Sequence, residues 1–152
     1  METELLSIVG DIYDCAIEPN RWPQAMERIA VTLGGKGASV TMQDPMQREI
    51  RVHAHWGFEA KFYSAMLDAA PINPLMSASW FQDLDEPYTG IGYIGRDDYY
   101  QTQFYREIIG RFGYCDAAIT NLVKTTNRFG ALVVGTRTSR ASGRMSNSIG
   151  SA

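Results

Sequence analysis

The chain has 152 residues with a formal net charge of −3, and 45% of its residues are apolar and 20% charged. This length corresponds to one domain with a core of its own, and the composition excludes a disordered or coiled-coil protein. No stretch approaches the roughly 18 consecutive apolar residues of a membrane-spanning helix. The acidic start Met1–Glu4 lacks the basic region of a secretory signal. We therefore expect a cytoplasmic protein, not associated with membranes, with reduced cysteines.

The charge is unevenly distributed along the chain. Residues 138–152 contain two arginines and no acidic residue, so residues 1–137, with 12 basic and 17 acidic side chains, carry a formal charge of −5. The last 15 residues are rich in Ser and Gly and show no apolar period, which predicts a flexible tail or linker. The folded domain is expected to span residues 1–137. Its acidic balance does not favour binding to a nucleic-acid backbone, which requires clustered Lys and Arg.

Two amphipathic helices are predicted at the N-terminus. Apolar residues at spacings of three and four mark one face of the first helix, and a turn at Glu18–Asn20 ends it. The second helix has Pro23 in its first turn, where a missing N–H is tolerated, and stops at Gly34–Gly35. The apolar stripe of the first helix consists of Leu5, Ile8, Val9, Ile12 and Ala16. It has two possible partners, the sheet of the same chain or a second copy of the helix in a homodimer.

Residues 37–43 and 50–56 are predicted to form two strands joined by a turn at Asp44–Pro45. In the second strand, apolar and polar residues alternate strictly, as in a strand with one buried face. The alternation places Ile50, Val52, Ala54 and Trp56 on one face and Arg51, His53 and His55 on the other.

The remainder of the chain is predicted to contain helices over 58–69, 75–81 and 97–111, with an irregular Gly-rich segment over 82–95. Two apolar strands follow, over 115–124 and 128–137, joined by a tight turn. Because the strands come in hairpins with helices between them, the pattern predicts an α+β fold with a mainly antiparallel sheet.

A glycine motif, Gly90-x-Gly92-x-x-Gly95, matches the dinucleotide-binding spacing. That motif requires a buried strand directly before it, whereas the preceding residues 83–89 are acidic and contain Pro87. Two aspartates, Asp97 and Asp98, follow it and would repel a pyrophosphate. We interpret the segment as a loop that covers a pocket, with Tyr93 as a possible gate.

His53 and His55 are spaced as zinc or iron ligands can be, but a metal site needs a third ligand, and the sequence does not indicate one. We therefore expect no metal and no cofactor. A haem- or flavin-binding sensor that uses one of these histidines stays open as an alternative. A small α+β enzyme with a pocket carboxylate such as Asp116 is the second alternative, although no nucleophile motif is present.

The 17 aromatic residues are the most informative feature, because many of them fall in the middle of the chain. Together with methionines they can line an apolar cavity with a polar rim. The residues predicted to contact a small ligand are Trp56, Phe62, Trp80, Phe81, Tyr93, Phe104 and Tyr105.

Several blocks resemble a known family. Asp14–Gly34, with Trp22-Pro23 at its turn, is similar to the opening of the N-terminal sensor domain of bacterial LuxR-type helix-turn-helix regulators. The segments Thr102–Glu107 and Gly113–Asp116 resemble a second hallmark of these domains, and Asn73-Pro74 and Gly130–Arg137 agree as well. The similarity covers about residues 5–137.

This resemblance implies a PAS- or GAF-like domain, with an antiparallel sheet of about five strands flanked by helices and a cavity between them. It also implies a small apolar or aromatic effector, homodimerisation through terminal helices, and no catalytic activity. A C-terminal helix-turn-helix domain would be expected, but none is present after residue 137, so this chain is not expected to contact DNA directly. The sequence thus predicts a ligand-sensing domain of a transcriptional regulator that responds by a shift between two conformations.

Overall fold

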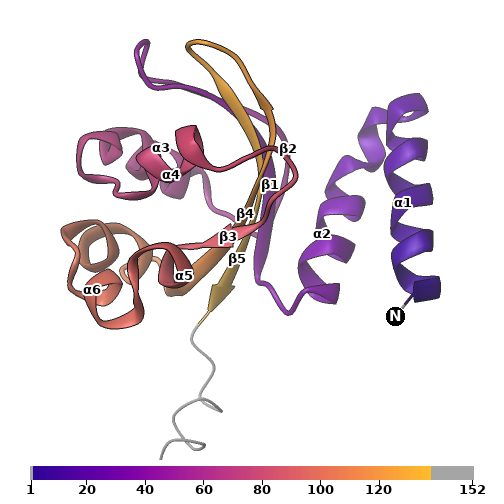
Figure 1. Ribbon diagram of the computed structural model, residues 1–152. Coiled ribbons are helices and arrows are strands. Elements are labelled where there is room, and N and C mark those ends of the chain that lie inside the picture. The colour runs from indigo at the N-terminus through magenta and orange to yellow at the C-terminus, as the bar shows by residue number, and fades with distance from the viewer. Residues whose placement is uncertain (1, 138–152) are drawn as a thin grey trace, which may run out of the picture.

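A computed structural model describes residues 2–137, and the predicted tail over 138–152 lies outside the described residues. The chain forms one five-stranded antiparallel sheet with helices on both faces (Figure 1). The strand order is β2-β1-β5-β4-β3. The strands are β1 (Gly37–Asp44), β2 (Glu49–Trp56), β3 (Tyr88–Thr89), β4 (Tyr114–Lys124) and β5 (Phe129–Arg137). The predicted α+β class and the sheet of about five strands are confirmed.

One face of the sheet carries the two N-terminal helices, α1 (Glu2–Ile17) and α2 (Trp22–Thr32), linked by a 3₁₀ turn at Pro19–Arg21. Helix α2 lies on the sheet, and α1 packs on the outer side of α2 (Figure 1). The core of this layer contains Ile8 of α1 together with Met26, Ile29 and Ala30 of α2 and Ala38, Ala54 and Val134 of the sheet. Gly34 ends α2 as predicted, in the left-handed conformation that glycine adopts most readily (φ 72°).

Helix α1 is the outermost element on this side of the sheet (Figure 1). It buries only Ile8 and Cys15, and it is tied to α2 by polar contacts, among them the ion pair between Arg28 and Asp11. The alternative in which the α1 stripe packs on the sheet is therefore wrong, because α2 occupies that position. Of the predicted stripe, Leu5, Val9 and Ile12 remain exposed.

The predicted alternation in β2 is interrupted by a β-bulge. Val40 pairs with Ala54, but the next residue, Thr41, pairs with Val52, so His53 is left out of the register. A bulge shifts the phase of the side chains by one residue. Ala54 and Trp56 consequently face α2. Ile50, Val52 and His55 lie on the opposite face, together with their strand partners Gln43, Thr41 and Ser39.

The other face of the sheet carries α3 (Ala60–Asp68), a 3₁₀ turn at Ala70–Ile72, α4 (Leu75–Phe81), α5 (Gly90–Ile94) and α6 (Arg96–Gln101) (Figure 1). Helices α3 and α4 occupy their predicted positions. The segment over 82–95, predicted to be irregular, instead contains β3 and α5. Within residues 2–137, no helix combines the length and apolarity needed to cross a membrane.

The helix predicted over 97–111 is broken into α6 and a π-helical turn at Tyr105–Ile109. The break falls at Thr102, which has an extended backbone conformation. Its hydroxyl donates a hydrogen bond to the carbonyl of Tyr99 (2.6 Å) and accepts one from the N–H of Tyr105 (3.1 Å). Threonine thus replaces the helical hydrogen bonds with side-chain ones, as short hydroxyl side chains do at helix ends.

Candidate functional site

A cavity of about 70 Å³ lies between the sheet and the helices of the second layer. The sheet contributes alternate residues of β5, namely Phe129, Ala131, Val133 and Gly135, together with Ala117 and Ile119 of β4. Because alternate residues of a strand share a face, β5 presents four residues in a row to the cavity. The two smallest of them, Ala131 and Gly135, leave space above the sheet.

The opposite wall is formed by apolar side chains from separate helices. Phe58 and Phe62, before and within α3, stack with ring centroids 5.1 Å apart, and Leu75 and Met76 come from α4. Phe58 lies directly on the sheet, because a Cβ atom at Gly37 or Gly135 would come within 2.9 Å of its ring. Phe104, which is fully buried, closes the cavity from the segment after α6.

Of the seven residues predicted to contact a ligand, the structure brings Phe62 and Phe104 into the wall of this cavity. Trp80 and Tyr105 lie behind the wall: Trp80 packs edge-on against Phe129 at 5.3 Å, and Tyr105 packs against the ring of Tyr99. The ligand-binding roles of all four residues remain predictions.

The other three lie elsewhere. Trp56 belongs to the core on the α2 face of the sheet, because the bulge in β2 sets its direction. Phe81, at the end of α4, is 81% exposed. Tyr93 is partly exposed on α5, and its hydroxyl lies 3.4 Å from that of Ser77.

Several residues of the cavity wall were not predicted from the sequence, including Leu75, Ile119, Ala131 and Val133. The sequence contains a signal for part of this wall, because the period-two pattern of residues 128–137 places Phe129, Ala131 and Val133 on one face of the strand. Small and aliphatic side chains, which a prediction based on aromatic residues does not include, create the space.

Asp116 is the charged residue in the cavity wall, and its carboxylate is bound by backbone groups. It accepts hydrogen bonds from the N–H groups of Gly90 (2.9 Å), Ile91 (3.1 Å) and Ala117 (2.8 Å). The first two belong to the start of α5, so Asp116 fixes this short helix to β4. The carboxylate considered above as a catalytic group of a small enzyme is therefore occupied by structural hydrogen bonds.

The same contacts explain the glycine motif. A Cβ atom at Gly90 would come within 2.6 Å of the Tyr99 ring and 2.8 Å of the Asp116 carboxylate. Gly90 is thus required by close packing. The predicted loop at Gly90–Gly95 is instead helix α5, with the Thr89 hydroxyl capping its N-terminus by accepting from the N–H of Gly92 (2.9 Å). Burial, and secondarily the charge of Asp116, raises the pKa of Tyr99 well above its usual value.

Of the two histidines considered as metal ligands, only His55 has a partner in the strand register. His55 pairs with Ser39 and lies with its ring 6.0 Å from that of Tyr63, and His53 lies at the bulge; both side chains are exposed. Across residues 2–137, no three His, Cys, Asp or Glu side chains are placed to hold a metal ion.

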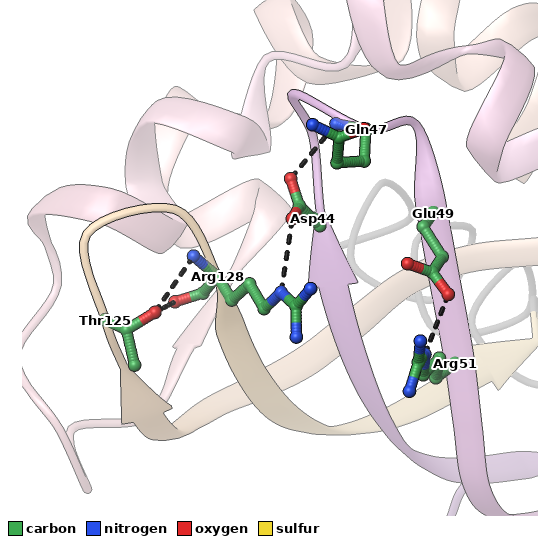
Figure 2. Close-up of polar contacts among 6 residues, drawn as sticks. All are labelled: Asp44, Gln47, Glu49, Arg51, Thr125 and Arg128. Atoms are coloured by element: carbon green, nitrogen blue, oxygen red, sulfur yellow. Dashed lines mark hydrogen bonds and ion pairs between the residues drawn. The ribbon is translucent and has the colours of Figure 1, made fainter.

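A second group of polar side chains joins the ends of the two hairpins. Asp44, at the end of β1, accepts hydrogen bonds from the N–H of Gln47 (3.0 Å) and from Nε of Arg128 (3.2 Å), which lies beside β5 (Figure 2). The Gln47 hydrogen bond and the neighbouring Arg128 guanidinium hold the pKa of Asp44 below its usual value. Glu49 and Arg51 form a separate, exposed ion pair within β2 (Figure 2).

The lowered pKa of Asp44 predicts a pH-dependent stability. A carboxylate with a folded-state pKa below its unfolded value of about 3.9 stabilises the fold above that value, and the contribution is lost as the pH falls through the folded-state pKa. Wild type should therefore exceed Asp44→Asn in free energy of unfolding at pH 6, and the difference should shrink below about pH 4. Urea denaturation between pH 2.5 and 7 measures it. Glu49→Gln, in the exposed pair, is the control and should show little difference.

The overall fold is similar to that of ligand-binding domains of LuxR-family regulators, as several solved structures show. No family model matches the sequence, and no curated protein matches it. The resemblance seen in the sequence is therefore confirmed at the level of the fold.

Three solved structures illustrate the similarity. The VqsR ligand-binding domain from Pseudomonas aeruginosa matches with a TM-score of 0.67 at 12% identity over 89% of this chain and 81% of that one. CepR2 from Burkholderia cenocepacia, an N-acylhomoserine lactone-dependent LuxR-family transcription factor, gives 0.55 at 12% identity over 88% and 80%. Escherichia coli SdiA gives 0.55 at 16% identity over 80% of this chain and 50% of its own, so the match spans half of the SdiA chain. These similar structures are regulator domains and not enzymes.

Proposed function

We propose that this chain is the ligand-sensing and dimerisation domain of a bacterial transcriptional regulator, and that a small, mainly apolar or aromatic molecule binds in the cavity above β5. The observation that carries the proposal is the cavity itself, lined by apolar side chains from both hairpin strands and from separate helices. The shared fold with ligand-binding domains of regulators supports the same role.

The size of the cavity suggests how a ligand would act. At about 70 Å³ it is well below the roughly 300–1,000 Å³ of pockets that hold drug-sized ligands. Binding of a larger molecule would therefore select a conformation with displaced walls. Met66 and Met76 in the wall are flexible enough to repack, and the π-helical turn that carries Ile109 is a local irregularity typical of functional segments.

In this mechanism the ligand shifts a conformational equilibrium that is passed to a DNA-binding helix-turn-helix domain of the same regulator. Moving a two-state equilibrium from 1:99 to 99:1 requires about 5.5 kcal/mol of differential affinity. A ligand that buries its apolar surface against the rings of Phe58, Phe62 and Phe104 can supply free energy of this order, at about 25 cal/mol per Å² buried.

Native mass spectrometry of the purified domain tests the ligand-sensing role. We expect a retained small molecule, or uptake from a library of small apolar compounds, in the wild type. Ala131→Leu adds three carbon atoms inside the cavity and should abolish the uptake, whereas Ala60→Leu adds the same atoms on an exposed position of α3 and should not. Equal uptake by wild type and Ala131→Leu would contradict binding in this cavity.

Homodimerisation through α1 is the second part of the proposal. The outer side of this helix exposes large apolar residues, including Leu6 (68%), Tyr13 (73%) and Ile17 (82%). Leu6, Tyr13 and Ile17 follow the spacings of seven and four that place residues on one helix face. A continuous apolar face of this kind is characteristic of an interaction surface.

The double substitution Leu6→Glu/Tyr13→Glu is therefore expected to convert a dimer into a monomer, because it places two charges in the apolar interface. Sedimentation velocity measures the change. Phe81→Glu/Leu84→Glu alters two exposed apolar residues beyond the second helical layer and should leave the dimer intact. An unchanged oligomer in the α1 variant would exclude this helix as the interface.

A further inference from the structure

A second, smaller hollow adjoins the cavity beneath the turn that joins β1 to β2. Its volume is about 10 Å³, and it lies between this turn and the helices α3 and α4 on the same side of the sheet (Figure 1). Three side chains, Gln43, Met66 and Met76, line both the hollow and the cavity. These side chains therefore form a partition between the two spaces.

The partition combines partial exposure with flexible side chains. Gln43, Met66 and Met76 are half-buried, whereas Phe62 and Phe104 in the same cavity wall are buried. Methionine is unbranched and has three rotatable bonds, so Met66 and Met76 can adopt new rotamers without a movement of the backbone. Their rotation would join the hollow to the cavity and open a passage to solvent beside the β1–β2 turn.

Arginine side chains outnumber carboxylates around the outer hollow. Asp44 and Glu49 line it, and each is already paired, with Arg128 at 3.2 Å and with Arg51 at 2.7 Å. Arg48 lines the hollow as well, and it forms no ion pair with a carboxylate within residues 2–137. Together these five side chains carry a formal charge of +1, so the mouth of the passage favours an anion.

The backbone of Arg48 is unusual for this residue type. It adopts the left-handed conformation (φ 52°), which is unfavourable for a residue with a Cβ atom and which glycine adopts readily. The turn is held by other groups, because the N–H of Gln47 donates to Asp44 (3.0 Å) and the N–H of Arg48 donates to the carbonyl of Pro45 (3.4 Å). Its geometry therefore does not call for arginine, and unfavourable conformations of this kind occur at ligand-binding positions.

The interior of the cavity, in contrast, disfavours an anion. Asp116 is the charged residue of its wall. The groups that donate to this carboxylate are uncharged backbone N–H groups, and no lysine or arginine of residues 2–137 forms an ion pair with it. Like charges repel more strongly in an apolar interior than in water. An acidic ligand would therefore place its apolar part inside and leave its acidic group at the mouth.

We propose that the ligand enters between Met66 and Met76 and that it is an aliphatic carboxylate. Its hydrocarbon chain lies in the cavity, and its carboxylate pairs with the guanidinium of Arg48 at the mouth, a pairing in which two N–H groups can donate to two oxygens. The inference rests on the proposed ligand-sensing function and narrows it to one class of ligand and one entrance.

Octanoate and 1-octanol, which share a chain length and differ in charge, are the probes for the role of Arg48. They are titrated calorimetrically into the 152-residue chain at pH 7.5. The ratio of the octanol Kd to the octanoate Kd is expected to fall about 3- to 5-fold in Arg48→Gln, the loss of one partly exposed ion pair. Arg111→Gln removes the same charge from an exposed position that lines neither space and should leave the ratio unchanged. An unchanged ratio in Arg48→Gln overturns the pairing.

The entrance is tested by the rate of association of octanoate, followed by stopped-flow tryptophan fluorescence. Trp80 is a suitable reporter, because its ring packs 5.3 Å from that of Phe129 in the cavity wall. In Met66→Ala and in Met76→Ala the association rate constant should rise about 2- to 10-fold, since no side chain has to leave its preferred rotamer. Met46→Ala alters an exposed methionine of the same turn and should have no effect. Wild-type rates in both partition variants overturn the entrance.

A crystal structure with octanoate decides the geometry. A chain that passes between Met66 and Met76, with its carboxylate within hydrogen-bond distance of Arg48, supports the proposal. A chain in the cavity with its carboxylate elsewhere overturns it and leaves the proposed function standing, as does a protein that binds other small apolar compounds in the cavity but neither probe. If the cavity takes up neither the probes nor any such compound, the proposed ligand-sensing function fails, and this inference with it.

Discussion

Replacing Asp116 by alanine should lower the free energy of unfolding by about 3 kcal/mol or more, the order expected when a charge-assisted hydrogen-bond network is removed. The carboxylate accepts from three backbone N–H groups, two of which begin α5. In the variant these donors lose their acceptor in a region where Gly90 and Tyr99 are buried. Chemical denaturation measures the loss, and hydrogen exchange should show α5 opening before the rest of the sheet.

Two substitutions serve as controls for this effect. Asp116→Asn keeps one carbonyl oxygen in place and should lose less stability than Asp116→Ala. Asp68→Ala removes a carboxylate from the exposed end of α3 and should stay within about 0.5 kcal/mol of wild type. If Asp116→Ala were as stable as Asp68→Ala, the proposed attachment of α5 to β4 through this carboxylate would be refuted.

Phe104→Ala is the second substitution with a large expected effect. Phe104 is fully buried in the cavity wall, and truncating a buried phenylalanine to alanine typically costs about 3–5 kcal/mol, because apolar contacts are lost and a cavity is left behind. Thermal unfolding should show a markedly lower Tm. Since the new space adjoins the existing cavity, small aromatic compounds should stabilise this variant more than they stabilise wild type.

Phe81→Ala is the matched control, because the same side chain is removed from an 81% exposed position. It should change the free energy of unfolding by no more than about 0.5 kcal/mol. Both phenylalanines were predicted from the sequence as ligand contacts, so the pair also tests which of the two positions belongs to the core. Equal losses for the two variants would contradict the placement of Phe104 in the wall.

Local patterns predicted most of the elements. The 3.6-residue period over residues 5–16, the Gly34–Gly35 stop and the alternating strands near 37–56 and 115–137 depend on neighbouring residues in the chain. The structure confirms these elements within a few residues. The antiparallel class followed from the same information, because strands that occur in hairpins pair with their neighbours.

The segment between α4 and β4 was predicted less well, for physical reasons. Strand β3 has two residues, and its pairing depends on β4, which lies 25 residues further on. Helix α5 has five residues, too few to be stable alone, and it begins where Asp116 offers two acceptors. The break at Thr102 depends on the hydrogen bonds that its hydroxyl forms with the backbone of Tyr99 and Tyr105, which replace helical hydrogen bonds.

The sequence by itself determined the α+β class, the order of most of the elements and the acidic character of residues 1–137, because periodicity, turn residues and composition act locally. Only the tertiary structure decided which side chains meet. The bulge at His53 turned Trp56 away from the cavity, α2 kept α1 off the sheet, and Thr41, Ala131 and Asn121 were brought side by side from three strands. Long-range register controls these contacts, and a shift of one residue exchanges the two faces of a strand.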